Sequence, residues 1–196
     1  MNQKSTQKLK EKHKAIIHDQ PYTGFVIGAD PGLKGGVAVF DCDAQKVVST
    51  FPMPVTHKTG ERASYDVPTL VDKLREVRPH SLEASCTFCI ERQHALPKQG
   101  VVSMFTTGFG FGLLCGIFAG IRTVFDRILV VKAQEWQSIL WEEDAPDSTK
   151  ARSIERVRRL FPYVDLWPNR NKKPSDGIAD AVNIAHYTYL RMCEVC

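Results

Sequence analysis

The sequence lacks several features that would place it in other protein classes. No apolar run approaches the roughly 20 residues that a membrane-spanning helix needs, and the most apolar stretch, 105–118, is interrupted by four glycines. The N-terminus lacks the apolar core of a secretory signal. No internal repeat is present, and no linker rich in glycine, proline or serine divides the chain. We therefore expect an intracellular, soluble protein with no membrane partner.

The six cysteines also do not form the pattern of a disulfide scaffold. Two Cys-x-x-Cys pairs, at 86–89 and 193–196, invite a zinc interpretation. We do not favour it, because the first pair lies in an apolar run typical of a strand, where residues three apart point to opposite faces. Reduced thiols are the expectation for an intracellular protein.

The net charge is only +4, but it is unevenly distributed over the 196 residues. Residues 1–20 carry +3, residues 150–173 carry +6, and the remainder carries −5. Basic segments beside an acidic remainder suggest a polyanionic partner held next to an acidic centre, although a solvated charged surface has the same composition. We expect a basic, flexible tail over 1–20 and one domain over 21–196, because 43% hydrophobic residues suffice for one core.

Hydrophobic periodicity predicts an α/β domain with a mixed five-stranded sheet flanked by helices. The predicted strands are 25–30, 37–40, 47–55, 87–90 and 127–131. The predicted helices are 67–78, 103–121, 133–141, 149–160 and 176–191, and we expect the second of these to be mostly buried. Asp66 and Ser175 are candidate N-caps.

Four carboxylates stand where such a fold would bring them together. Asp30 and Glu91 end two predicted strands, and Asp176 and Asp180 lie four residues apart on one face of the last helix. Grouped carboxylates are costly unless a cation neutralises them, and Mg²⁺ prefers such oxygen ligands. Two such ions about 4 Å apart would support hydrolysis of a phosphodiester.

Each carboxylate also has a purely structural explanation. Asp30 stands before Pro-Gly and is a good turn residue, and Glu91 has Arg92 beside it for an ion pair. Asp176 in a first helical turn interacts favourably with the helix dipole. Asp180, one turn further along and among apolar residues, is the hardest to assign to the surface.

Three segments together resemble RuvC-type Holliday-junction resolvases of the ribonuclease H-like superfamily. They are Gly-Ala-Asp-Pro-Gly-Leu-Lys-Gly-Gly at 28–36, Cys-Ile-Glu-Arg-Gln at 89–93, and the stretch 173–185 that holds the last two acids. The glycine- and phenylalanine-rich segment 98–112 resembles the branch that contains the plant chloroplast resolvase and its phage relatives. One departure is the four-residue spacing from Asp176 to Asp180, where bacterial RuvC uses three.

This resemblance implies a ribonuclease H-like fold and a homodimer that cleaves four-way DNA junctions by paired, symmetric nicks. It implies that Asp30, Glu91, Asp176 and Asp180 hold two Mg²⁺ ions per site, with Mn²⁺ as a substitute and no small-molecule cofactor. It also places Lys150 near the scissile phosphate, where it would position water or stabilise charge, although an ordinary surface lysine remains the alternative.

Basic, polar and aromatic residues around these segments are candidate DNA contacts. Arg152, Arg156 and Arg159 recur on one helical face without obvious partners, and two glycine-flanked phenylalanines could stack on bases from a loop. The same segment contains Gly112, Gly116 and Gly120, whose spacing would allow close packing on the sheet or on a partner subunit. The further candidates are Lys34, Arg92, Gln93, His94, Lys98, Gln99, Phe109, Phe111, Arg170, Lys172 and Lys173. We expect His186 to be a structural histidine rather than a ligand.

Three other functions remain open. A ribonuclease H-like nuclease acting on an RNA–DNA hybrid or an RNA precursor would use the same acids. The segment after Asp30 also resembles the phosphate loop of the actin-like ATPases and sugar kinases, but that fold needs two such domains. A non-catalytic junction-binding protein is disfavoured, because a DNA binder has no reason to place four acids near phosphates.

Overall fold

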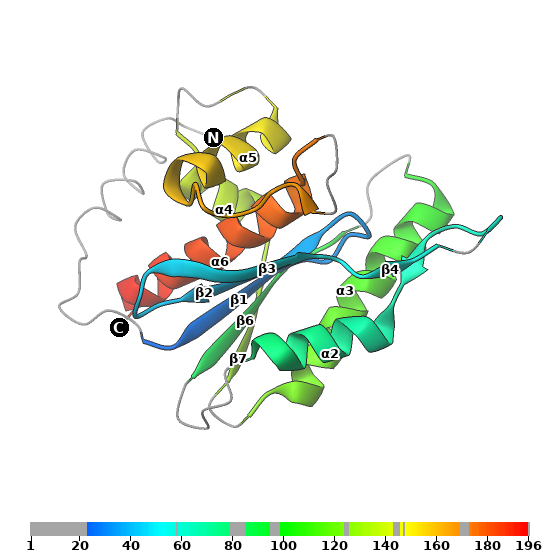
Figure 1. Cartoon of the computed structure of the whole chain (residues 1–196), viewed down its shortest axis with the longest axis horizontal. Helices are drawn as coiled ribbons and strands as arrows, with labels where there is room; N and C mark the ends of the chain where they lie inside the picture. The colour runs from blue at the N-terminus through cyan, green and yellow to red at the C-terminus, as the bar shows by residue number, and fades with distance from the viewer. Residues whose placement is uncertain are drawn as a thin grey trace.

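The computed structural model describes residues 23–57, 59–78, 85–94, 99–123, 126–142, 146, 148–168 and 173–195. The predicted tail over 1–20 lies outside these residues, as does Cys196 of the second Cys-x-x-Cys pair. Figure 1 shows the elements of the remaining domain.

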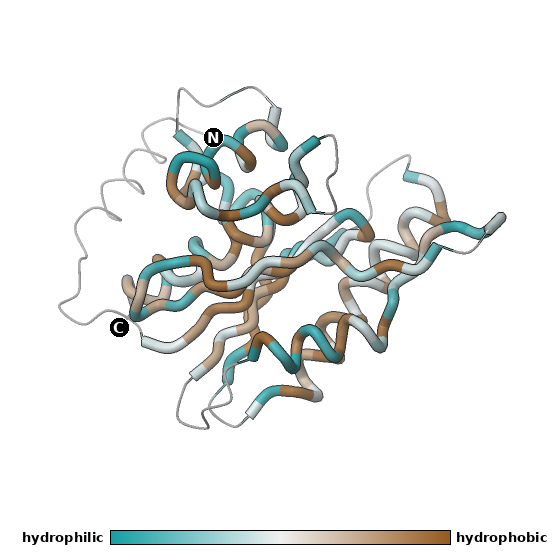
Figure 2. The backbone as a smooth tube through the Cα atoms, in the orientation of Figure 1, coloured by the Kyte–Doolittle hydropathy of each residue, from teal (hydrophilic) through white to brown (hydrophobic). Residues whose placement is uncertain are grey.

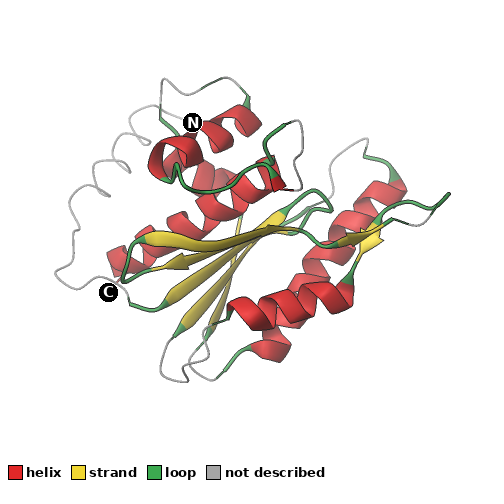
Figure 3. Ribbon diagram, in the orientation of Figure 1, coloured by secondary structure: helices red, strands yellow, loops and turns green. Residues whose placement is uncertain are grey.

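A five-stranded mixed sheet forms the centre of the domain, in the order β3-β2-β1-β6-β7. Strand β2 (Gly36–Asp41) pairs antiparallel with both of its neighbours, β1 (Phe25–Asp30) and β3 (Lys46–Pro52). On the other side of β1, β6 (Cys86–Glu91) pairs parallel with β1, and β7 (Arg127–Val131) pairs parallel with β6 (Figure 3). This arrangement confirms the predicted mixed sheet. The third strand is shorter than predicted, because the chain leaves the sheet at Pro52.

A separate two-stranded sheet comes after β3 along the chain. It consists of β4 (Val55–Thr56) and β5 (Ser64–Tyr65), and it precedes α2 (Val67–Val77). Asp66 caps α2 as predicted: the Thr69 backbone N–H donates to its carboxylate at 3.2 Å.

Helices cover both faces of the central sheet (Figure 1). The long α6 (Asp176–Val195) packs on one face together with α4 (Ala133–Leu140) and α5 (Thr149–Leu160). The other face is covered by α2 and by α3 (Val101–Ile121). The apolar colouring in Figure 2 follows the strands and the inner sides of these helices.

Successive side chains along each buried strand point to opposite faces of the sheet, and this alternation divides the core into two layers. Val26 packs in the cluster under α5 and α6, whereas the next residue, Ile27, packs in the cluster under α2 and α3. Cys86 and Cys89 fall in different clusters for the same reason, and burial raises the pKa of the Cys89 thiol to about 12. The first Cys-x-x-Cys pair therefore does not converge on one metal ion.

Gly28 lets α6 approach the centre of the sheet. A Cβ atom at Gly28 would lie 2.4 Å from the Ala181 carbonyl oxygen and 2.6 Å from the Ala185 amide nitrogen. Both atoms belong to the α6 backbone and have no rotamer that would avoid the clash. The absence of a side chain in the middle of β1 thus fixes how closely the helix that carries the last two acids can pack.

Helix α3 differs most from its prediction. It begins at Val101, and the segment 108–112, expected partly as a loop, lies inside the helix. It is also only sparsely buried: Gly110, Leu114 and Phe118 are its buried residues, and the others are half-buried or exposed. By length and composition it is the one helix in the described ranges that could cross a membrane, with 17% of its most apolar window buried. The sequence analysis had not expected such a helix.

Candidate active site

The first two acids lie at adjacent strand ends. Asp30 is the last residue of β1 and Glu91 is the last residue of β6, and these strands are parallel neighbours in which Ala29 pairs with Ile90. The Gly32 backbone N–H donates to Asp30 Oδ1 at 3.1 Å, so the turn after β1 helps to orient this carboxylate. The parallel register therefore brings Asp30 and Glu91 to the same edge of the sheet.

The N-terminus of α6 is joined to the same edge. Gly177 forms a β-bridge with Gly35 in the loop after β1, and a Cβ atom at Gly177 would lie 2.1 Å from the Lys34 carbonyl oxygen. This close approach places Asp176 and Asp180, one helical turn apart, beside the Asp30 loop. Ser175 caps the helix as predicted, since its Oγ accepts from the Ile178 N–H at 3.2 Å.

The carboxylates lie near enough to one another to alter their protonation. Burial raises the pKa of Asp30, and the charge of Asp176 raises it further. Burial and the charges of Asp30 and Asp180 raise the pKa of Glu91 to about 8. The pKa of Asp180 rises to about 7, mainly through burial and then through Asp30 and Asp176. The four predicted acids thus form one electrostatically coupled cluster.

Lys150 supplies the positive charge closest to this cluster. It lies in the first turn of α5, and its Nζ forms an ion pair with Asp176 Oδ2 at 2.5 Å. This contact, with smaller contributions from Asp180 and Asp30, raises the pKa of the Lys150 ammonium group. The lysine side chain is 72% exposed, so it remains accessible to a ligand from solvent.

A chain of buried hydrogen bonds leads from the core to Asp180. The Arg156 guanidinium donates to Asn183 Oδ1 at 2.8 Å, Asn183 Nδ2 donates to Ser153 Oγ at 2.7 Å, and Ser153 Oγ donates to Asp180 Oδ1 at 2.5 Å. The donors point in one direction, toward the carboxylate, and the Ser153 bond lowers the pKa of Asp180. Sequence reasoning missed Ser153 and Asn183, although their spacing places them on the facing sides of α5 and α6.

His186 closes the far end of this chain. An arginine can only donate, so the contact at 3.0 Å from Arg156 Nη2 makes His186 Nδ1 the acceptor and leaves the ring neutral. Burial, and secondarily the Arg156 charge, lowers the pKa of His186 to about 3. The expected structural role of this histidine agrees with these contacts.

We predict that His186 makes the domain sensitive to mild acid. The unfolded histidine binds a proton below its ordinary pKa of about 6.5, whereas the folded one does not until about pH 3, so stability falls as the pH drops below about 6.5. This group alone should remove about 2 kcal/mol of unfolding free energy between pH 7 and pH 5. Urea unfolding of wild type and His186→Asn, which keeps an acceptor near the position of Nδ1, measures the difference. Equal pH dependence of the two proteins would contradict the prediction.

The chemistry of the donor set suits a hard divalent cation. The cluster offers carboxylate oxygens, and the pKa values of three of its members are raised first by burial and then by the charges of neighbouring carboxylates, an effect that a bound cation would offset. As they stand, the described His, Cys, Asp and Glu side chains form no group of three or more that would enclose a metal ion. The carboxylates would have to move toward an ion, and the Lys150–Asp176 pair would have to rearrange.

Trp136 borders the cluster from α4. Its side chain is fully buried, and its indole nitrogen makes no hydrogen bond of normal length and angle within the described part of the chain. The indole N–H nevertheless lies near Glu91 and lowers the pKa of that carboxyl.

The predicted basic face of α5 is not formed as expected. Arg156 is buried and belongs to the hydrogen-bond chain, where burial lowers its pKa to about 10. Arg159 forms a two-bond ion pair with Glu142, with both distances 2.6 Å. Arg152 donates to the Pro146 carbonyl. The expectation that these three charges lack partners is wrong, because the loop after α4 and helix α6 supply partners that sequence spacing does not reveal.

The remaining candidate DNA contacts are divided between accessible and undescribed positions. Of the described candidates, Lys34, Arg92, His94 and Lys173 are exposed, while Gln93 and Gln99 are half-buried. Gln99 Nε2 donates to Ser103 Oγ at the start of α3. Lys98, Arg170 and Lys172 lie outside the described residues.

The two candidate phenylalanines lie in different surroundings. Phe109 is 48% exposed and lies between Phe105 and Tyr65, at ring-centroid distances of 6.3 and 5.8 Å. Phe111 is half-buried against the core under α3. Tyr65, which the sequence analysis did not single out, donates to the Pro31 carbonyl at 2.8 Å and thereby connects α3 to the turn after Asp30.

No known family model matches the sequence, and no curated protein is similar to it in sequence. Solved structures do resemble it. Thermus thermophilus RuvC in complex with a Holliday junction substrate is 19% identical over 86% of this chain and 96% of its own, with a TM-score of 0.55. The yeast mitochondrial Holliday junction resolvase Ydc2 is 15% identical over 100% of this chain and 92% of its own, with a TM-score of 0.51. These likenesses establish the ribonuclease H-like fold that was predicted.

Proposed function

We propose that this protein is a metal-dependent endonuclease that resolves four-way DNA junctions. The observation that carries the proposal is the coupled cluster of Asp30, Glu91, Asp176 and Asp180, with Lys150 paired to one of them. Solved structures of similar fold include T. thermophilus RuvC in complex with a Holliday junction substrate and the yeast mitochondrial Holliday junction resolvase Ydc2. A fold alone does not define a substrate, so the cluster and its surroundings carry the argument.

In the proposed mechanism the four carboxylates would hold two Mg²⁺ ions, for which Mn²⁺ would substitute. Bound there, the metal ions would lower the pKa of the attacking water and stabilise the leaving oxygen. The hydrogen bond from Ser153 would favour the ionised form of Asp180 against the effect of burial, and the Gly32 N–H would do the same for Asp30. The exposed Lys150 ammonium would move from Asp176 to a non-bridging phosphate oxygen. Cleavage would leave a 5′-phosphate and a 3′-hydroxyl.

We test the substrate with end-labelled mobile four-way junctions in Mg²⁺, beside linear duplex and an RNA–DNA hybrid of matched sequence. Paired nicks at symmetric positions, confined to the junction, are expected. If only the hybrid is cleaved, the protein is still a nuclease, but its substrate is an RNA–DNA hybrid and not a four-way junction. Junction binding without cleavage in Mg²⁺ or Mn²⁺ would leave only a binding protein.

We further propose that the protein is a homodimer, which would give two sites for two symmetric nicks. The exposed side of α3 is the proposed interface. A Cβ atom at Gly112, Gly116 or Gly120 would meet nothing within 4 Å, so these glycines do not serve packing on the sheet. Phe105 on the same helix is 73% exposed, and an apolar face of this kind is typical of a surface that is covered by a partner.

We predict that Gly116→Arg separates the subunits. A charged side chain at a close helix–helix contact would cost several kcal/mol through lost packing and desolvation. Sedimentation should give twice 22.0 kDa for wild type and 22.0 kDa for the variant. Glu76→Arg, on the exposed side of α2, is the matched control and should remain dimeric. A wild-type monomer at assay concentrations would contradict the proposed dimer.

A further inference from the structure

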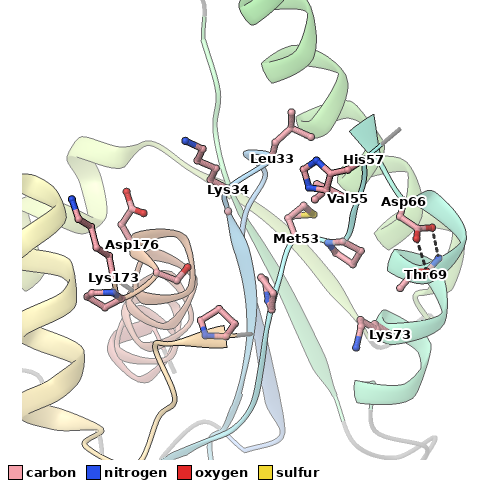
Figure 4. A pocket seen from close by; sticks show the side chains of 16 residues that line it. Leu33, Lys34, Met53, Val55, His57, Asp66, Thr69, Lys73, Lys173 and Asp176 are labelled. Atoms are coloured by element: carbon pink, nitrogen blue, oxygen red, sulfur yellow. Dashed lines mark hydrogen bonds between the residues drawn. The ribbon is translucent and has the colours of Figure 1, made fainter. Parts of the chain in front are cut away.

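A groove of about 770 Å³ opens beside the acid cluster, on the side away from α5 (Figure 4). Its walls come from the loop after β1, the segment that leaves β3, helix α2 and the loop before α6. Asp176 lies at one side of the groove and α2 lies at the other. The groove therefore offers a path from the acids across the surface of the domain.

Three lysines from three different elements line this groove. Lys34 follows β1, Lys173 precedes α6, and Lys73 is on α2. In Figure 4, Lys34 and Lys173 lie on the side of Asp176, whereas Lys73 lies at the opposite wall, with His57 above it. Positive charge is thus present along the groove and not only at its end.

The carboxylates of the groove are already engaged. Asp66 accepts from both the backbone N–H and the hydroxyl of Thr69, at 3.2 and 2.8 Å, and Asp176 is paired with Lys150. Over the described ranges, no ion pair joins Lys34, Lys73 or Lys173 to a carboxylate. The groove therefore presents lysine ammonium groups that are available to bind an anionic ligand.

The remaining walls are apolar and mostly aliphatic. Leu33, Met53 and Val55 line the groove, together with four prolines. Lys73 is half-buried, and its Nζ lies 5.4 Å from the centre of the Phe51 ring, which limits the freedom of the ammonium group. Lysine ammonium groups are common partners of the phosphates of a nucleic acid backbone, and phosphate contacts of this kind fix how a protein lies along the nucleic acid.

We propose that this groove holds the sugar–phosphate backbone of one arm of the DNA substrate, leading from the acid cluster toward α2, with Lys73 and Lys173 each contacting a phosphate. This inference rests on the proposed function and adds a path for the DNA that the motifs do not indicate. Lys73 is new in this role, since nothing in its sequence surroundings distinguishes it from a solvated helix lysine.

The test measures binding of a fixed four-way junction by the full-length protein without divalent metal, so that no cleavage occurs. Fluorescence anisotropy is followed across a series of salt concentrations for wild type, Lys73→Gln, Lys173→Gln and the double variant. Each lost phosphate contact should weaken binding and reduce the slope of log K against log salt by about 1, and the double variant by about 2. Lys46→Gln, an exposed lysine at the opposite end of β3, is the matched control and should retain the wild-type slope.

Neutral methylphosphonates placed singly along one arm then locate the contact. One position should weaken wild-type binding as much as Lys73→Gln does, and it should cause no further loss in Lys73→Gln. If the wild-type protein binds the junction and both lysine variants keep the wild-type slope of log K against log salt, the groove does not hold the DNA. That result would leave the proposed function intact. A wild-type protein that binds no junction would overturn both.

Discussion

Replacing Asp30 by asparagine is expected to abolish junction cleavage while leaving the folded protein at least as stable as wild type. Asp30 lies at the centre of the cluster, since its charge acts on Glu91, Asp180 and Lys150. Loss of this charge would remove a metal-ligating oxygen and should lower the cleavage rate at least about a thousandfold. Single-turnover cleavage of an end-labelled junction at saturating protein measures the effect on chemistry apart from binding.

The expected stability of Asp30→Asn follows from the raised pKa of Asp30. Burial disfavours the ionised carboxyl, so the charge costs stability at neutral pH, and the isosteric neutral amide avoids that cost. Urea unfolding without metal should therefore give an equal or higher midpoint for Asp30→Asn. Asp72→Asn, at an exposed position on α2, should change neither property. A slow variant that is also clearly destabilised would indicate a structural role for Asp30 instead.

Gly28→Ala is expected to be strongly disruptive although it adds only one methyl group. Its Cβ atom would lie within 2.4 Å of the α6 backbone, so the helix must move away from the sheet. We expect a loss of about 3 kcal/mol in unfolding free energy. Cleavage should also fall by roughly a hundredfold, because Asp176 and Asp180 move with the helix and small misplacements of catalytic groups are costly.

The matched control for this variant is Gly108→Ala. Gly108 is exposed inside α3, and a Cβ atom there meets nothing within 4 Å. Since alanine favours helix over glycine by about 1 kcal/mol, this variant should be slightly more stable than wild type. Thermal unfolding of the two variants therefore separates the effect of an added methyl group from the effect of its location. Similar stability of both would show that α6 can shift without cost.

The order of the helices and the central strands could be predicted, because hydrophobic periodicity and the turn residues beside each element indicate its type. The strand 25–30, the capping residues Asp66 and Ser175, and the acids at two strand ends and in the first turns of α6 follow from patterns within a few residues. The exposure of α3 could not be predicted, because an apolar helix has the same composition whether the sheet or a partner covers it. The partners of Arg156 and Arg159 lie 27 and 17 residues away, beyond any local pattern.

The sequence by itself determined the α/β order of elements and where the four acids lie on them, because the type of each element is encoded by its local pattern, whereas the ribonuclease H-like fold was predicted from the resemblance of three segments to RuvC-type resolvases. Only the tertiary structure decided which charges are available to a ligand. Tertiary packing buried Arg156 and His186 in contact with each other and placed Ser153 and Asn183 beside Asp180. It also placed Lys34, Lys73 and Lys173 along one groove. Burial and pairing depend on contacts between distant segments, and single-residue chemistry does not contain that information.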